Sequence, residues 1–458
     1  MPLALMASLP LAAATGAQPS TAATALSLAQ AVGNALRNYP SIRVSQEQVN
    51  AAAAGIQLAR TAYLPRIDTL ALVNRATRNN VFGLLLPQSV IPSMSGPVIG
   101  TNNFGTAWGS AVGVLVSWEP FDFGLRQANV AAASAARRQS EAEVKRTQFE
   151  VAVATADAYL TLVASQETVR AAQAGVDRAE VVLRTTNALV NSQLRPGADA
   201  SRAEAELAAA RTQLIQADEA TGVARATVSQ FIGVDPPRIS VSAAGLLQLP
   251  PDRTVAPFDA AANPLALEQT AAIERTRTQL RALERSYFPH FYLQGAAYSR
   301  GTGAELNGGR LGGLNGLAPN FQNYAVGFNV MFPVMDIESL RAREAEQSAD
   351  IRAQVARGEQ IATDLRAQWN RAVASFEGSR RIAANTPVEV TAARTATEQA
   401  TARYQSGLGT IDQVAEAQRL LTQAEIDDAL ARLAVWRALL GIAVAAGDIQ
   451  PFVAEASP

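Results

Sequence analysis

The sequence contains one pattern twice, and this internal repeat limits the possible folds more than any other feature. From Asp122 to Gly233 the chain matches itself without a gap at positions 214 further along. The matching pairs include Asp122 with Asp336, Ser192 with Ser406, Leu194 with Leu408, and Gly233 with Gly447. Earlier in the chain, Pro40 and Pro65 recur as Pro264 and Pro289 at an offset of 224. The difference between the offsets falls between these regions, where loops tolerate insertions. Such self-similarity indicates two copies of one structural unit.

Each copy contains a stretch that alternates like a β-strand. Between Trp108 and Trp118 the even positions are mostly apolar and the odd positions are mostly small; Tyr324 to Phe332 alternates in the same way. Ten residue steps at about 3.3 Å, tilted near 45°, rise about 23 Å, close to the apolar band of an outer-membrane barrel. Because aromatic residues mark the edges of that band, we predict Trp108, Trp118, Tyr324 and Phe332 at the membrane interfaces. A strand of a soluble sandwich alternates equally, so the stretch alone leaves both readings open.

The expected order in each copy is helix, strand, loop, strand, long helix, tight turn and helix. The long helix of the first copy, from about Leu125 to Val190, would extend on the order of 100 Å. Alanines recur every seven residues after both turns, which indicates closely packed coiled-coil seams. They are Ala203, Ala210, Ala217 and Ala224, and then Ala417, Ala424, Ala431 and Ala438. We expect Pro387 to kink or interrupt the second long helix, since proline lacks the N–H donor.

The domain bounds follow from this layout. Residues 1–17 resemble a cleaved secretory signal. Residues 18–233 form the first repeat, 234–262 a linker, 263–447 the second repeat and 448–458 an extended tail. Strands are expected at about 66–78 and 107–119 in the first repeat, and at about 290–300 and 323–334 in the second. Beyond the N-terminus no apolar run reaches the roughly 18 residues of a membrane-spanning helix, so none is expected.

Composition excludes several kinds of site. The chain has no cysteine and one histidine, which excludes a Cys/His zinc site and a disulfide scaffold. The net charge of −1 gives no indication of a nucleic-acid partner. We find no nucleophile–base pair and no metal-ligand spacing, so we predict no catalytic residue, metal or cofactor. His290 follows a proline at a strand start and is expected to be a lumen or interface residue.

Four strands are too few for one chain to close a barrel, because bacterial barrels begin at eight strands. An open edge in hydrocarbon leaves backbone groups that lipid cannot satisfy. The strands must therefore be completed by other copies of the chain. Three copies would supply twelve strands, although the sequence itself does not determine the threefold symmetry.

Short motifs at matching positions of both repeats resemble the TolC-type outer-membrane factor family over about residues 26–447. They are YLP and YFP before the strands, WEPFDFG and FPVMDIE after them, and SGLGTIDQVAEAQ at a helical turn. The resemblance implies a trimeric channel-tunnel, a mixed fold with a membrane β-barrel and an α-helical barrel in the periplasm.

The same resemblance implies the partners and the function. They are two further copies of the chain, a periplasmic adaptor protein, indirectly an inner-membrane transporter, and outer-membrane lipid. The implied function is an exit duct of a tripartite efflux system for drugs, toxic compounds or metal ions, and the alternative is the outer-membrane channel of type I protein secretion. A soluble coiled-coil scaffold is the alternative from another class.

Two turns are similar to the adaptor-docking motif of that family. The first contains Ser192, Leu194 and Gly197, and the second contains Ser406, Gly407, Leu408, Gly409 and Thr410. Gly407 and Gly409 permit the positive φ of a tight turn, and Thr410 with Gln413 forms a capping-box pattern. The first turn departs from the motif, because Gln193 and Arg195 stand where the second has glycines. Both turns also fit a purely structural role as helix caps.

Polar residues just beyond the turns are the candidates for an entrance gate. They are Asp199 and Arg202 after the first turn, and Asp412, Gln413 and Glu416 after the second. Residues three or four apart share a helix face. Gln413 and Glu416 match the paired aspartates of the family, and the Gln removes one charge per chain. We predict a salt link between the two turns that helps to hold the entrance closed; a solvated helix face is the alternative.

Overall fold

The computed structural model describes residues 26–77, 105–242, 245–251, 258–305 and 309–457. The predicted signal segment 1–17 and nearly all of the loop between the first two strands lie outside these residues. The chain divides into two compact units. We call Met1–Tyr39, Gln148–Phe258 and Gln368–Pro458 the helical unit, and Pro40–Thr147 and Asp259–Ala367 the sheet unit.

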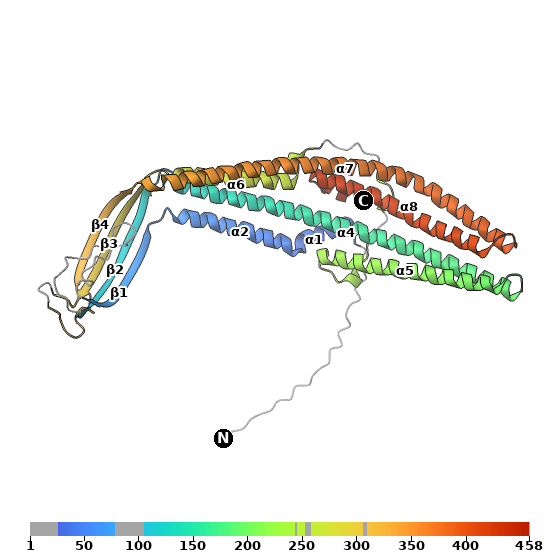
Figure 1. Ribbon diagram of the computed structural model, residues 1–458, viewed down its shortest axis with the longest axis horizontal. Coiled ribbons are helices and arrows are strands. Elements are labelled where there is room, and N and C mark those ends of the chain that lie inside the picture. Colours follow the sequence, from blue (N-terminus) through green and yellow to red (C-terminus); the bar gives the residue numbers. More distant parts are fainter. Residues whose placement is uncertain (1–25, 78–104, 243–244, 252–257, 306–308, 458) are drawn as a thin grey trace, which may run out of the picture. The chain divides into compact units, whose positions relative to one another are not determined.

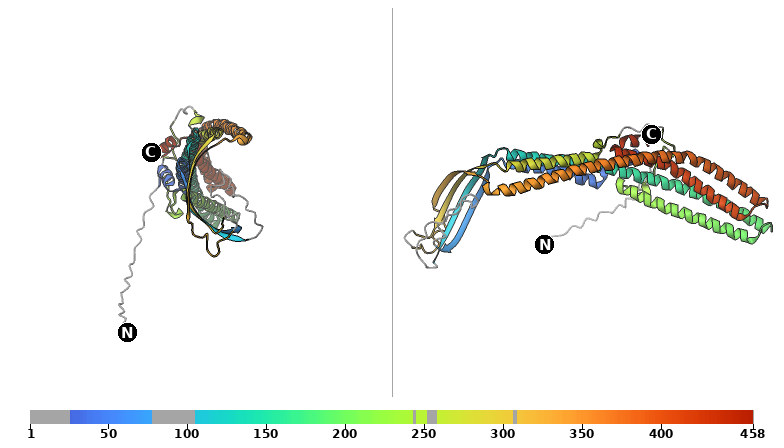
Figure 2. Two further views of the ribbon diagram at one scale, coloured as in Figure 1. Left: turned by 90° about the vertical axis from the view of Figure 1, so that its left-hand side faces the viewer. Right: turned by 45° about the horizontal axis from the view of Figure 1, so that its top comes forward.

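The sheet unit is built on one antiparallel sheet of four strands in the order β1-β2-β3-β4 (Figures 1 and 2). The strands are β1 (Arg66–Thr77), β2 (Thr106–Phe121), β3 (His290–Thr302) and β4 (Phe321–Met331). Around them are α2 (Pro40–Thr61), η2 (Ala260–Ala262), α6 (Pro264–Arg285), η3 (Val334–Asp336) and the first parts of α4 (Leu125–Asn191) and α7 (Ile337–Gln405). β4 ends earlier than the predicted 334, because Pro333 has no N–H to donate to a ladder. Phe332 therefore lies just beyond the strand.

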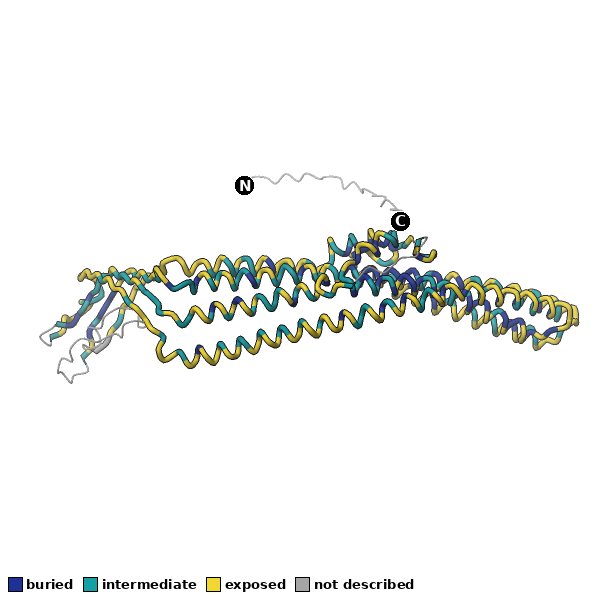
Figure 3. Tube along the Cα trace, turned by 90° about the horizontal axis from the view of Figure 1, so that it is seen from above, coloured by how far each residue is buried: buried dark blue, intermediate teal, exposed yellow. Residues whose placement is uncertain are grey.

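The helical unit contains the remaining parts of α4 and α7. Its other elements are α1 (Leu28–Asn38), α5 (Gly197–Ile232), η1 (Pro236–Arg238), α8 (Ile411–Ala446) and α9 (Gln450–Glu455). Its largest core combines α1, α4, α5, the inter-repeat linker, α8 and α9, and Figure 3 shows buried residues concentrated around the C-terminus. Tyr159 is fully buried there, and its hydroxyl lies 2.8 Å from the carbonyl oxygen of Leu26 and 2.9 Å from that of Ser242. Burial raises the pKa of Tyr159 to about 12, so the neutral phenol holds the two segments together.

Element bounds recur with the offsets seen in the sequence. Adding 214 to the bounds of α5 yields those of α8, and adding 224 to the bounds of α2 yields those of α6. Both α5 and α8 end at a glycine in the left-handed conformation, Gly233 (φ 70°) and Gly447 (φ 81°). Glycine is the usual residue at this position because it lacks the steric penalty of a Cβ.

Two sequence predictions were wrong, the interruption of the second long helix and the extended tail. Pro387 does not interrupt the helix, since α7 continues through it to Gln405, and a kink at Pro387 stays a prediction. Ala383 and Thr386 before the proline and Ala393 after it are buried, and the Thr386 hydroxyl donates to Asp428 of α8 at 2.8 Å, so packing outweighs one lost hydrogen bond. The tail is not wholly extended either. It forms α9, whose buried Phe452 belongs to the core of the helical unit.

α8 is long and apolar enough to cross a membrane by composition, with a mean hydropathy of 1.7 over 18 residues. The sequence predicted no helix of this kind, because its apolar runs are interrupted before they reach about 18 residues. Its apolar residues contribute to several buried clusters of the helical unit, among them Val414, Leu421, Val435 and Leu440. The core packing explains the composition of α8 without a membrane.

Candidate functional site: two helical turns and an apolar sheet face

The two turns predicted as docking sites have matching backbones. In the first turn, the N–H of Leu194 donates to the carbonyl oxygen of Leu189 at 2.9 Å; in the second, Leu408 donates to Arg403 at 2.8 Å. Gln193 has a φ of 62° where its equivalent Gly407 has 85°. A left-handed backbone carries a steric cost for every residue except glycine, so the first turn retains the shape of the second despite an unfavourable residue.

The two turns start their following helices differently. The capping box predicted at the second turn is confirmed: the Thr410 hydroxyl accepts from the N–H of Gln413, whose side chain accepts from the N–H of Thr410. At the first turn Pro196 is the N-cap, without a side-chain hydrogen bond, and α5 begins at Gly197. The N-cap position is thus occupied by proline in the first turn and by threonine in the second.

Each turn presents one leucine to the surroundings. The exposed fraction is 70% for Leu194 and 74% for Leu408. The serines of the turns are directed back to their own helices: Ser192 donates to the carbonyl oxygen of Ala188 and Ser406 to that of Ala402. In each turn the leucine is therefore an exposed apolar side chain.

Arg195 and Tyr404 connect the turns, a role that was not predicted from the sequence for either residue. Arg195 donates to the carbonyl oxygens of Tyr404 (2.5 Å) and Gly409 (3.0 Å), and its guanidinium lies 4.4 Å from the centre of the Tyr404 ring. The Tyr404 hydroxyl in turn donates to Asp199 at 3.0 Å. The sequence did contain one indication of this contact. Arg195 has a long, charged side chain that can reach the other turn, whereas its repeat equivalent Gly409 has no side chain.

The predicted gate residues lie around this cross-link. Arg202 forms an ion pair with Asp412 at 3.3 Å, which joins α5 to α8. Glu416 pairs with Arg419 of its own helix at 3.6 Å, and the side chain of Gln413 serves the capping box. The salt link between the turns thus involves Asp412, while Asp199 contributes through Tyr404.

A second carboxylate extends the link along the helices. Glu206 of α5 accepts from Arg202 and from Arg419 of α8, each at 3.1 Å. Burial raises the pKa of Tyr404, and the hydrogen bond and charge of Asp199 raise it further, so Tyr404 remains a neutral donor at physiological pH. The contacts between the turns consist of one aromatic–cation stack and several charged hydrogen bonds. We call the contacts of Arg195, Tyr404, Asp199, Arg202 and Asp412 the turn clamp.

One face of the sheet carries apolar side chains across all four strands. Two neighbouring rows of register partners cross this face from β1 to β4. One row contains Ile67, Val116, Gly295 and Val326, and the next contains Thr69, Val114, Ala297 and Tyr324. The valines and aromatic residues of this face are exposed, from 37% for Val116 to 87% for Tyr324. The opposite face includes Asp68, Gln294 and Asn329. A continuous exposed apolar face marks an interaction surface rather than a solvated one.

The four predicted interface aromatics lie at different places in this sheet. Trp118 is 39% exposed, and its indole donates to the carbonyl oxygen of Tyr63 at 3.1 Å. Trp108, at the opposite end of β2, is half-buried beneath the guanidinium of Arg75. Tyr324 lies within β4, and Phe332 is 64% exposed just beyond it.

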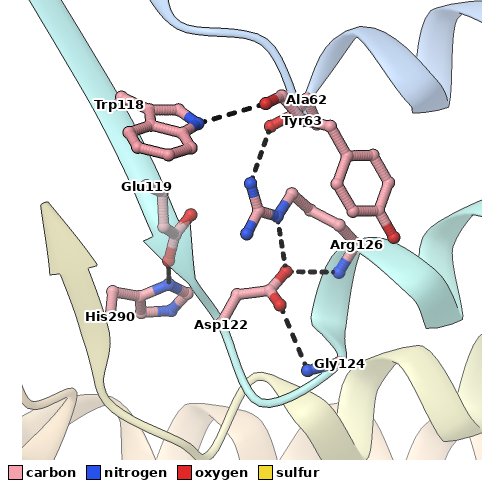
Figure 4. Close-up of polar contacts among 8 residues, drawn as sticks. All are labelled: Ala62, Tyr63, Trp118, Glu119, Asp122, Gly124, Arg126 and His290. Carbon is pink, nitrogen blue, oxygen red and sulfur yellow. Dashed lines mark hydrogen bonds and ion pairs between the residues drawn. The ribbon is translucent and has the colours of Figure 1, made fainter.

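Polar contacts hold the junction between β2 and α4 (Figure 4). The Asp122 carboxylate accepts from the N–H of Gly124 (3.1 Å), the N–H of Arg126 (2.6 Å) and Nε of Arg126 (2.9 Å). Burial alone would raise the pKa of Asp122, but these hydrogen bonds and the Arg126 charge lower it overall. Beside them His290 Nδ1 lies 2.7 Å from Glu119 Oε1, a side-chain pair between β3 and β2.

Comparison with known proteins agrees with this geometry. The family model of the outer membrane efflux protein matches residues 31–234 and 259–448. The pyoverdine export outer membrane protein OpmQ of Pseudomonas aeruginosa is 26% identical over 354 residues, which cover 74% of this chain and 69% of that protein.

Solved structures share the fold. The Campylobacter jejuni CmeC outer membrane channel aligns with a TM-score of 0.72 at 15% identity, covering 94% of this chain and 89% of its own. The outer membrane protein VceC of Vibrio cholerae aligns with a TM-score of 0.70 at 17% identity, covering 92% and 96%. Among the described residues no cluster of three or more Asp, Glu, His or Cys is placed to hold a metal ion. With both repeats matched by the family model, the chain belongs to the outer membrane efflux protein family and resides in the outer membrane, with its helical part in the periplasm.

Proposed function

We propose that three copies of this chain form the exit duct of a tripartite efflux system, which conducts small molecules passively to the cell exterior. The observation that carries the proposal is the pair of turns that present Leu194 and Leu408 at the ends of the long helices. A periplasmic adaptor protein would dock there and connect the duct to an inner-membrane transporter. The export of pyoverdine named for OpmQ supports a small-molecule cargo.

The open edges of the sheet support an assembly of several copies. β1 and β4 are its outer strands, and each has one edge without a partner strand in the described chain. Unpaired backbone groups in hydrocarbon cost several kcal/mol each, so these edges need partners. In the proposed assembly β1 of one copy pairs with β4 of the next, and twelve strands close the barrel. The apolar faces then form its outer surface.

The turn clamp is proposed to hold the entrance closed. Tyr404 and Arg195 join the helical hairpin α4–α5 to the hairpin α7–α8, and Arg202 with Asp412 adds a second link. Exposed ion pairs contribute only about 0–1 kcal/mol each, so the contacts of the buried Tyr404 and the half-buried Arg195 carry most of the effect. A closure of this strength can be reversed when an adaptor binds.

A complementation experiment tests the docking surface. A strain that lacks the gene should be sensitive to toxic compounds, and the wild-type gene should restore resistance. Leu408→Glu should fail to restore it while the protein still reaches the outer membrane, because a charge replaces the exposed apolar contact. Leu420→Glu is the control, since Leu420 is 49% exposed on α8 but lies away from the turn.

The same strains distinguish the alternative function. If loss of the gene leaves compound sensitivity unchanged but retains a protein that is normally secreted, the chain serves type I secretion and the efflux proposal fails. If Leu408→Glu and Leu420→Glu restore resistance equally, the turn is not the docking surface.

Single-channel recordings in planar lipid test the gate. Tyr404→Phe and Arg195→Ala should each raise the mean conductance, because each removes a link between the two hairpins. Arg211→Ala is the control, since the ion pair of Arg211 with Glu180 at 2.9 Å joins two helices of the same hairpin. Unchanged conductance in both clamp variants would contradict the closing role of the clamp.

A further inference from the structure

We propose that Arg75, Thr106 and Trp108 form a binding site for the phosphate of a membrane lipid at the outer rim of the sheet. The proposal rests on the outer-membrane location and is independent of the cargo that the duct conducts. It assigns a ligand to residues that take part in neither the turn clamp nor the docking turns.

The site lies where the apolar face of the sheet ends. Arg75 is the register partner of Trp108, and the next pair on the same face is Val73 with Ser110. The helices join the other end of the sheet, where α2 precedes Arg66 and α4 follows β2. Since the helical part lies in the periplasm, the end with Arg75 faces the outer leaflet. This is the depth at which lipid phosphates meet the apolar band.

The Arg75 guanidinium is oriented but retains unused donors. Its Nε donates to the Thr106 hydroxyl at 3.1 Å, and its Cζ lies 5.3 Å from the centre of the Trp108 ring. Among the described residues the contacts of the Arg75 guanidinium are those with Thr106 and Trp108, and neither is a carboxylate. The two terminal nitrogens are therefore available for a phosphate, which guanidinium groups bind through paired hydrogen bonds. The aromatic contact already restricts the Arg75 side chain, so less conformational entropy is lost when a ligand binds.

Charge favours an anionic ligand at this end of the sheet. The described rim residues 74–77, 105–109, 299–305 and 309–322 contain three arginines and one carboxylate, Glu305, which is a net charge of +2. At the helix-bearing end, residues 63–68, 117–126, 288–292 and 329–336 contain four carboxylates and two arginines, a net charge of −2 with His290 neutral. Among the rim cations Arg310 lies against Gly105, the residue before Thr106. An anion is thus attracted to the rim with Arg75 and repelled from the opposite end.

The surface below Arg75 selects a lipid over a free phosphate ion. Val73, Val112 and Val114 follow on the same face and are 61%, 47% and 42% exposed. Acyl chains attached to a phosphate at Arg75 would cover these valines and remove apolar area from water or detergent. A free phosphate ion would gain only the polar contacts.

The test measures lipid binding to the purified, detergent-solubilised protein by native mass spectrometry. The probes are phosphatidylglycerol, a diacylglycerol with the same acyl chains but no phosphate, and inorganic phosphate. The proteins are wild type, Arg75→Gln and Arg66→Gln. Arg66 is the matched control, because it lies at the other end of β1 and pairs with Asp68 at 2.9 Å.

Arg75→Gln should weaken phosphatidylglycerol binding about 10- to 100-fold, the equivalent of a lost charged hydrogen-bond pair. Diacylglycerol binding should be unchanged, and Arg66→Gln should bind like wild type. Arg75→Lys should give an intermediate affinity, because it retains the charge without the paired donors. The proposal is overturned if Arg75→Gln retains wild-type affinity, if Arg66→Gln loses as much, or if inorganic phosphate binds as tightly as phosphatidylglycerol. Circular dichroism of each variant shows whether the sheet is intact, and Arg75→Lys answers the question if Arg75→Gln fails to fold.

Discussion

Replacing Asp122 by alanine should open the junction between β2 and α4. The Asp122 and Arg126 side chains are only 9% and 8% exposed, so the carboxylate and the guanidinium depend on each other for solvation. Removing one partner of such a buried pair costs about 3–5 kcal/mol, because the other charge remains buried. Arg126 keeps two weaker contacts, with the carbonyl oxygen of Ala62 at 3.4 Å and the Tyr63 ring at 4.8 Å, which favour the lower end of the range.

Hydrogen exchange of peptides that cover residues 119–130 measures this effect locally. A loss of about 3 kcal/mol lowers protection by about 100-fold, since each 1.4 kcal/mol is a factor of ten. Asp336→Ala is the control, because Asp336 is the repeat equivalent of Asp122 but is exposed, and Leu340 replaces Arg126 there. Asp336→Ala should change the free energy of local opening by no more than about 0.5 kcal/mol.

The same contact predicts a pH dependence. The folded-state pKa of Asp122 lies below the ordinary value of 3.8, so its contribution is present above that pH and is lost as the pH falls through the folded pKa. The difference in protection between wild type and Asp122→Asn should therefore shrink below about pH 4. The reasoning is refuted if Asp122→Ala and Asp336→Ala change protection equally, or if the difference between wild type and Asp122→Asn persists undiminished in acid.

Three further predictions concern stability. Tyr159→Phe should lower the stability of the helical unit by about 1–3 kcal/mol, because a buried carbonyl oxygen loses its donor; an unchanged melting temperature would contradict this. Pro387→Ala should stabilise the chain by about 1–3 kcal/mol, since α7 is already helical there and gains a donor; calorimetry that shows destabilisation would count against it. Gly316→Ala should expose the loop at 309–320 to protease, because φ is 97° and a Cβ would lie 2.3 Å from the Trp108 carbonyl oxygen. Gly312→Ala, with open space around it, should leave cleavage unchanged, and equal cleavage of both variants would refute the steric argument.

Local interactions could be read from the sequence. The capping box of Thr410 and Gln413 joins residues three positions apart, so their identities were sufficient to predict the start of α8. The repeat offsets placed the bounds of α2 on α6 and those of α5 on α8, because equivalent residues form equivalent helices. Alternation in β2 identified the face that carries Val112, Val114 and Val116, since successive side chains of a strand point to opposite sides.

Contacts between distant segments could not be read in this way. Arg195 and Tyr404 are 209 residues apart, and no spacing rule connects an arginine in one turn with a tyrosine in another helix. From the sequence, Arg202 could pair with either Asp412 or Glu416 near the second turn. The packing of α5 against α8 determines that it pairs with Asp412. The pairing of Arg75 with Trp108 likewise depends on the register of β1 against β2.

Local preference was also overruled by burial. Pro387 is unfavourable in a helix by about 3 kcal/mol, yet α7 continues because Ala383 before the proline and Ala393 after it pack against α8. The tail forms α9 because Phe452 and Val453 enter the core of the helical unit. The sequence thus determined most of the helices, whose hydrogen bonds close within four residues, and the strands, whose side chains alternate between two faces. The tertiary structure decided which elements meet, because the free energy of burying distant side chains together exceeds the local preferences of any single residue.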